Sequence, residues 1–129
     1  MPLPRVALIP GHSTSDPGTV TAYGTEYALI LDRAKLVAVE AAGRFTPVLI
    51  HRAPGRNGLR DLPAAVNAAK VACAVEFHMN AAASATATGT EMLAWSTSAR
   101  SQALAKLLQA AGLQALGLRD RGVKLLTEG

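Results

Sequence analysis

The sequence has almost no cysteine and few aromatic residues. Cys73 is the only cysteine among 129 residues, and phenylalanine, tryptophan and tyrosine together make up 4% of the chain. A single cysteine excludes an intrachain disulfide and any zinc site built from several thiolates. Half of the residues are nevertheless hydrophobic, so the core must consist mainly of alanine, valine, leucine and isoleucine. This length suits one compact domain, and we expect residues 1–129 to form it.

Long apolar runs and blocks of like charge are also missing. The first residues, "MPLPRVALIPGH", contain an arginine, early prolines and only a short apolar stretch. This pattern fits neither a signal peptide nor a membrane anchor, so we expect a soluble protein made in the cytoplasm, without a membrane partner. The formal charge of +4 is spread along the chain. No aromatic stripe accompanies it, so nucleic acid is not an expected partner either.

Apolar runs typical of buried strands alternate with segments of helical periodicity. The expected strands are residues 5–9, 46–52, 71–78 and 90–95, and the expected helices are residues 25–43, 61–70 and 98–112. Thr25 and Asp61 are the expected N-caps, and Gly112 is expected to end the last helix. Residues 113–129 show no clear pattern. The alternation predicts a single α/β domain with a mostly parallel, twisted sheet flanked by helices.

Two histidines stand where predicted strands end. His12 follows the first strand and His78 ends the third, and ligands of parallel sheets bind at this edge. A lone histidine there is usually a surface residue, whereas a pair favours a metal site that needs a third ligand. Glu26 is the preferred third ligand and Asp16 the competing one, although the helix dipole alone also favours an acid at position 26. We expect His51 to have a surface or supporting role.

Several segments together resemble a known enzyme family. The motifs that carry the likeness are "LIPGHSTSDPGT", "VLIHR", "VNAAKVACAVEFHMNAA" and "GTEMLAWSTSARSQALAKLL". In this order they resemble the zinc-dependent N-acetylmuramoyl-L-alanine amidases, a class that includes cell-separation amidases and phage endolysins. The resemblance implies that His12, Glu26 and His78 bind Zn²⁺, and that Asn80 borders the substrate cleft.

The same resemblance implies a substrate and a cellular role. The expected reaction is hydrolysis of the amide between N-acetylmuramic acid and L-alanine in peptidoglycan, which is the expected partner. Zinc suits an amide because it polarises the carbonyl and lowers the pKa of bound water to about 7. The expected role is bacteriolytic, with the chain reaching the cell wall through a holin or after removal of a leader.

The general base is the point at which this sequence departs from the family. Relatives carry a glutamate on a strand beyond the segment that reads "RGVK" here, and Glu128 comes too early to match it. Glu76 stands where many relatives have serine, and strand alternation places it on the same face as His78. Glu76 can therefore support the His78 imidazole or serve as a substitute base.

The departure near the C-terminus leads to two further expectations. We expect the family's C-terminal strand to be missing, which would leave an uncovered sheet edge. The expected consequence is either a partner chain on this edge, as in self-association, or a fragment of lower stability. Without the family's base, an alternative function is a non-catalytic, zinc-containing module that binds peptidoglycan or has a structural role.

Overall fold

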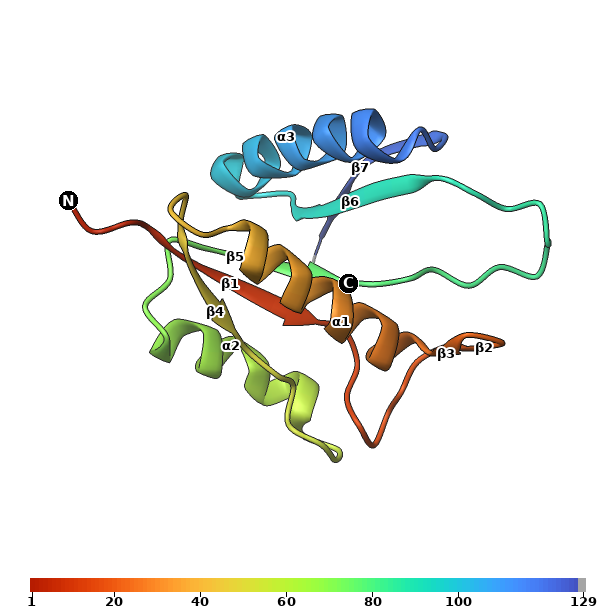
Figure 1. Cartoon of the computed structure of the whole chain (residues 1–129), viewed down its shortest axis with the longest axis horizontal. Coiled ribbons are helices and arrows are strands. Elements are labelled where there is room, and N and C mark those ends of the chain that lie inside the picture. The colour runs from red at the N-terminus through yellow and green to blue at the C-terminus, as the bar shows by residue number, and fades with distance from the viewer. Residues whose placement is uncertain (128–129) are drawn as a thin grey trace. The chain divides into compact units, whose positions relative to one another are not determined.

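Parallel strand pairs form the framework of the chain in a computed structural model, which describes residues 1–127 (Figure 1). The chain divides into two compact units, with the second beginning at Ala82. The first unit contains β1 (Arg5–Pro10), β2 (Val20–Thr21), β3 (Gly24–Thr25), α1 (Glu26–Glu40), β4 (Thr46–Leu49), α2 (Gly58–Ala68) and β5 (Cys73–Phe77). The second contains β6 (Thr90–Trp95), α3 (Ala99–Leu116) and β7 (Asp120–Leu126).

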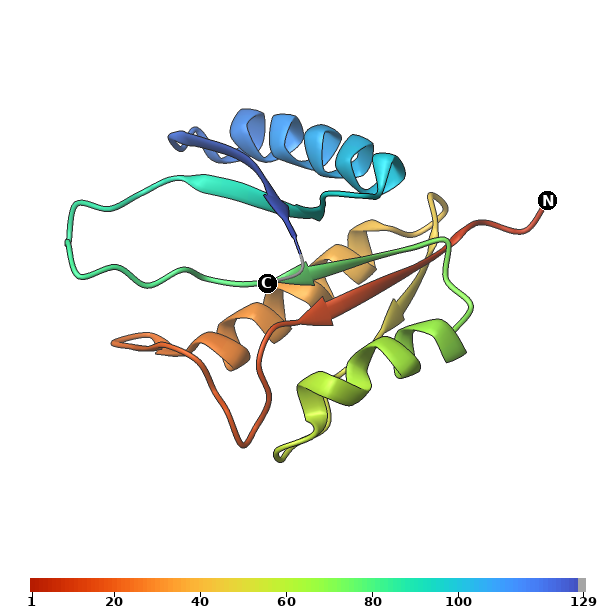
Figure 2. The ribbon, with the colours of Figure 1, turned by 180° about the vertical axis from the view of Figure 1, so that it is seen from behind.

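The first unit is built around β1, the central strand of a parallel sheet with the order β4-β1-β5. Because β1 has a neighbour on each side and a helix on each face, Ala7, Leu8 and Ile9 are all buried. Successive side chains of a strand point to opposite faces. Ala7 and Ile9 accordingly pack against Leu62 of α2, while α1 covers the other face of the sheet (Figures 1 and 2).

The start of α1 agrees with the expectation from the sequence, whereas the start of α2 differs from it. Thr25 caps α1 as expected, since its hydroxyl accepts a hydrogen bond from the Ala28 N–H at 3.3 Å. The expected cap at Asp61 is wrong, because α2 already begins at Gly58 and Asp61 lies within its first turn. The second strand also ends earlier than expected, at Leu49. Its last three predicted residues therefore belong to the loop that carries Arg52.

In the second unit, β6 and β7 pair in parallel and α3 packs on both strands. The expected helix end at Gly112 is wrong, because α3 continues to Leu116 and stops at Gly117 in a left-handed conformation with φ of 62°. Alanine and leucine favour helix strongly enough to carry it through one glycine.

The expectation that the tail lacks regular structure is also wrong, because Asp120–Leu126 forms β7. The pairing register shifts between Thr90 with Asp120 and Met92 with Val123. Gly122 lies inside this irregularity with φ of 81°. A bulge of this kind interrupts the period-two pattern by which a strand is recognised in a sequence.

The expected α/β fold, with mostly parallel strands and flanking helices, is confirmed by these elements. Only the short β2–β3 pair is antiparallel among the strands of residues 1–127. None of the helices in these residues combines the length and the apolar character needed to span a membrane.

Candidate metal centre

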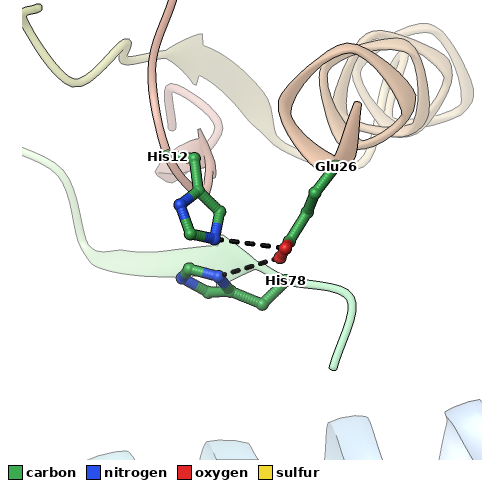
Figure 3. A group of neighbouring side chains, drawn as sticks. All are labelled: His12, Glu26 and His78. Carbon is green, nitrogen blue, oxygen red and sulfur yellow. Dashed lines mark hydrogen bonds and ion pairs between the residues drawn. The ribbon is translucent and has the colours of Figure 1, made fainter. Parts of the chain in front are cut away.

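Three side chains from separate parts of the first unit converge at one point (Figure 3). His12 follows β1, Glu26 is the first residue of α1, and His78 follows β5. Their potential ligand atoms all lie within 4.8 Å of one another. His12 Nε2 is 3.2 Å from Glu26 Oε2, and His78 Nδ1 is 3.3 Å from Glu26 Oε1. The carboxylate thus faces one imidazole with each of its oxygens.

Glu26 is held in place by backbone groups from two loops. The Met79 N–H donates to Oε1 at 2.8 Å, and the Thr19 N–H donates to Oε2 at 3.1 Å. The residue is only 3% exposed. Burial acts to raise the pKa of Glu26, but these two hydrogen bonds and the neighbouring histidines outweigh it and lower the pKa below its ordinary value. Glu26 is therefore an ionised carboxylate at neutral pH, available as an anionic ligand.

Glycines allow the histidines to approach the strand ends closely. The Gly11 N–H donates to the Phe77 carbonyl at 2.8 Å, which joins the end of β1 to the end of β5. A Cβ at position 11 would lie 2.5 Å from His78 Cε1, so a side chain there would displace the ring. His12 itself has φ of 69°, a left-handed conformation that a residue with a large side chain rarely adopts. Such conformations concentrate at functional sites.

A second carboxylate lies near each histidine on the far side of its ring. Glu76 Oε1 is 3.0 Å from His78 Nε2, and Asp16 Oδ2 is 3.6 Å from His12 Nδ1. Asp16 also accepts a hydrogen bond of 2.6 Å from Arg52 NH2. The bond to Arg52 is the main cause that lowers the pKa of Asp16. The hydrogen bond with Glu76 is the main cause that raises the pKa of His78.

The structure brings His12, Glu26 and His78 together and places the other candidates around them. Asp16, the competing third ligand, lies outside the group that could hold a metal ion, and it contacts Arg52 on the outer side of His12. Asn80 is exposed and lies two residues after His78.

His51, the third histidine of the sequence, is not part of the group that could hold a metal ion. The Nδ1 atom of His51, an exposed residue, lies 3.1 Å from the Tyr27 hydroxyl. Glu128 lies outside the described residues.

Sequence reasoning missed the pairing of Arg52 with Asp16. The two residues are 36 positions apart, and no local pattern links them. The backbone donors Met79 and Thr19 were also missed. Every residue except proline has a backbone N–H, so the residue type does not show which of these groups donates to a side chain.

Comparisons with known proteins place the chain in a family. The family model described as N-acetylmuramoyl-L-alanine amidase matches residues 6–126. A search of curated proteins finds no match to the sequence.

Solved structures of similar fold carry the same description. An N-acetylmuramoyl-L-alanine amidase from Clostridium difficile 630 is 24% identical with a TM-score of 0.83, and the match covers 98% of this chain and 72% of that chain. One from Nostoc punctiforme is 23% identical with a TM-score of 0.80, covering 95% and 68%. At these identities the likeness shows the fold alone.

A third structure, from Neisseria meningitidis, is that of a candidate N-acetylmuramoyl-L-alanine amidase. It is 32% identical with a TM-score of 0.72, and the match covers 95% of this chain and 67% of that chain. Together with the family match over nearly the whole sequence, these findings lead to one conclusion. The chain belongs to the N-acetylmuramoyl-L-alanine amidase family.

Proposed function

We propose that the chain is a zinc-dependent amidase that hydrolyses the bond between the lactyl group of N-acetylmuramic acid and the L-alanine of the peptidoglycan stem peptide. The observation that carries this proposal is the convergence of His12, Glu26 and His78 within 4.8 Å. It occurs in a chain whose residues 6–126 match the amidase family. Peptidoglycan is accordingly the proposed partner.

The chemistry of the three side chains fits a catalytic zinc ion. Two imidazoles and one carboxylate, with a further position left for water or substrate, are a known donor set for catalytic zinc. Donor atoms about 2.0–2.2 Å from one tetrahedral ion lie roughly 3.3–3.6 Å apart. The distances of 3.2 Å and 3.3 Å from the two histidines to Glu26 are close to this range. The buried Glu26 also provides the negative charge that a cation requires.

The roles of the three residues follow from their contacts. His12 and His78 would supply neutral nitrogen ligands, and Glu26 would supply an anionic oxygen whose direction is set by the Met79 and Thr19 N–H groups. When bound, zinc would supply a Lewis acid that polarises the amide carbonyl and makes water a nucleophile near neutral pH.

Glu76 and Asn80 are the residues proposed to act on substrate. Glu76 is the proposed general base, and its carboxylate lies 3.0 Å from His78 Nε2, the ring nitrogen that faces away from Glu26. General-base help typically contributes roughly 100- to 10,000-fold to a rate. Asn80 is exposed in the segment that follows β5, so its side chain is proposed to contact the sugar or peptide beside the scissile bond.

The test is to incubate the zinc-loaded chain with purified peptidoglycan and to identify the soluble products by mass spectrometry. We expect stem peptides with a free L-alanine amine, and none after chelation or in His12→Ala and His78→Ala. Glu76→Gln at saturating zinc tests the base separately, with an expected rate loss of roughly 100-fold or more. Zinc binding without products would support the alternative of a non-catalytic module that binds peptidoglycan.

A further inference from the structure

The two histidines of the centre share a feature on their outer sides. In each ring, one nitrogen faces Glu26 and the other faces a second carboxylate. We propose that Glu76 and the Asp16–Arg52 pair are positioning residues that fix which nitrogen of each ring faces the centre. This inference rests on the proposed zinc site and says which residues hold the His12 and His78 rings in the orientation that binds the metal.

Glu76 fixes the orientation of His78. Its Oε1 atom lies 3.0 Å from Nε2, a hydrogen-bonding distance. An ionised carboxylate only accepts, and a ring that binds a metal ion through Nδ1 keeps its single proton on Nε2, from which it would donate to Glu76. Nδ1 is the nitrogen that faces the centre, 3.3 Å from Glu26 Oε1. Because the His78 side chain is 39% exposed, packing alone holds the ring weakly and the contact with Glu76 supplies the missing restraint.

Asp16 has the corresponding role for His12, and Arg52 holds Asp16 there. Arg52 is largely buried and donates to Asp16 Oδ2 at 2.6 Å. The backbone of the same loop is closed by the Ser13 N–H, which donates to the Asp16 carbonyl at 3.0 Å. Asp16 is thus fixed both through its side chain and through its backbone.

The His12 ring needs such a neighbour. Its Nδ1 atom is buried and has no hydrogen-bond partner among the described residues. The Asp16 carboxylate oxygen Oδ2 lies 3.6 Å from this atom, beyond hydrogen-bonding distance. An N–H on Nδ1 directed at this anion leaves Nε2 unprotonated, 3.2 Å from Glu26 Oε2. His12 and His78 would therefore bind metal through different ring nitrogens, Nε2 and Nδ1 respectively.

Zinc affinity tests the proposal directly. Glu76→Ala and Asp16→Ala should each raise the zinc dissociation constant by about 10- to 100-fold, the usual effect of removing a group that orients a ligand. Glu76→Gln should restore much of the affinity, because its amide oxygen still accepts from Nε2. Glu40→Ala and Asp32→Ala remove the same charges from exposed positions of α1, and they should change affinity less than threefold. Losses no larger than in these controls would overturn the proposal.

The ring nitrogens give a second readout that does not depend on activity. Long-range ¹H–¹⁵N NMR spectra of the zinc-loaded protein should show protonated Nδ1 in His12 and protonated Nε2 in His78. The opposite assignment in either ring would overturn the proposal for that histidine.

The absence of zinc binding can be distinguished from the absence of ring positioning. If the wild-type chain binds no zinc, the proposed function fails, and the same spectra of the zinc-free protein above the pKa of His78 decide the inference. A proton on Nε2 that Glu76→Ala redistributes between the two nitrogens would support positioning by Glu76. A distribution that is unchanged by the substitution would refute it.

Discussion

Gly18 lies so close to His12 that no side chain fits between them. A Cβ at position 18 would be 2.6 Å from His12 Cδ2 and 2.7 Å from Glu26 Oε2. The backbone at Gly18 also has φ of 71°, in the left-handed region. The loop between β1 and α1 therefore touches two members of the candidate metal centre through a residue that has no side chain.

We predict that Gly18→Ala weakens zinc binding by at least about tenfold, since the methyl group must displace His12 or Glu26 and disturbed ligand positioning typically costs 10- to 100-fold. Competition with a chelating indicator measures this affinity. Gly43→Ala is a matched control, because Gly43 has a similar φ of 77° and nothing within 4 Å of its Cβ position. Both variants should lose about 1–2 kcal/mol of stability from backbone strain, but only Gly18→Ala should lose zinc affinity.

Glu26→Gln should remove zinc binding and loosen at least one of the two loops that Glu26 holds. The amide has one accepting oxygen where the carboxylate has two, so either the Met79 or the Thr19 N–H loses its acceptor. An unsatisfied buried group costs about 1–3 kcal/mol. Hydrogen exchange should become faster at one or both of these amides, while Glu40→Gln at the other end of α1 should leave both protected. Unchanged exchange would show that the Glu26 carboxylate does not hold these loops.

His78 should titrate above its ordinary pKa of 6.5 in the zinc-free protein. The hydrogen bond with Glu76 is the main cause, and burial opposes it. A raised pKa in the folded state means that this interaction stabilises the zinc-free protein below pH 6.5, and that the contribution is lost as the pH rises through the folded pKa. NMR titration should show the pKa of His78 falling in Glu76→Ala. A pKa that does not move would contradict the contact.

Zinc binding should show the opposite dependence on pH. A histidine must be neutral to bind a metal ion, so protons compete with zinc at His78. Affinity should therefore weaken as the pH falls through the raised pKa of this residue. Isothermal titration of the wild-type chain with zinc at several pH values measures the effect, together with the protons released on binding.

The second unit offers a stability prediction that does not involve metal. Gln109 is a buried residue of α3 whose Nε2 donates to the Thr90 carbonyl at 2.8 Å and to Asp120 Oδ1 at 2.7 Å. Gln109→Met should lower the free energy of unfolding by about 1–3 kcal/mol, because the Thr90 carbonyl loses this donor and Asp120 Oδ1 keeps only the Gly122 N–H. Gln114→Met on an exposed position of the same helix should stay within about 0.5 kcal/mol of wild type. Chemical denaturation of the whole chain checks both.

The local sequence pattern was sufficient to predict an element where the segment has one clear pattern, such as an apolar run or a capping residue before a periodic segment. The apolar run at residues 5–9 predicted β1, which extends one residue further to Pro10, and the threonine before a periodic segment predicted the cap of α1. Local pattern failed for β7, because the irregularity at Gly122 breaks the alternation and only pairing with β6 makes the segment a strand. It failed again at Gly112, where packing on β6 and β7 supports a helix that a glycine alone would weaken.

The sequence by itself determined that His12 and His78 stand at strand ends and that Glu26 begins a helix, because each of these is a property of a short segment. Only the tertiary structure decided that Glu26 faces both rings, that Glu76 contacts His78 on its outer nitrogen, and that Arg52 holds Asp16. These contacts join residues through space, and their distances depend on how β1, β4 and β5 align in the sheet. Residue identity specifies which groups can bind a metal, whereas packing specifies which of them meet.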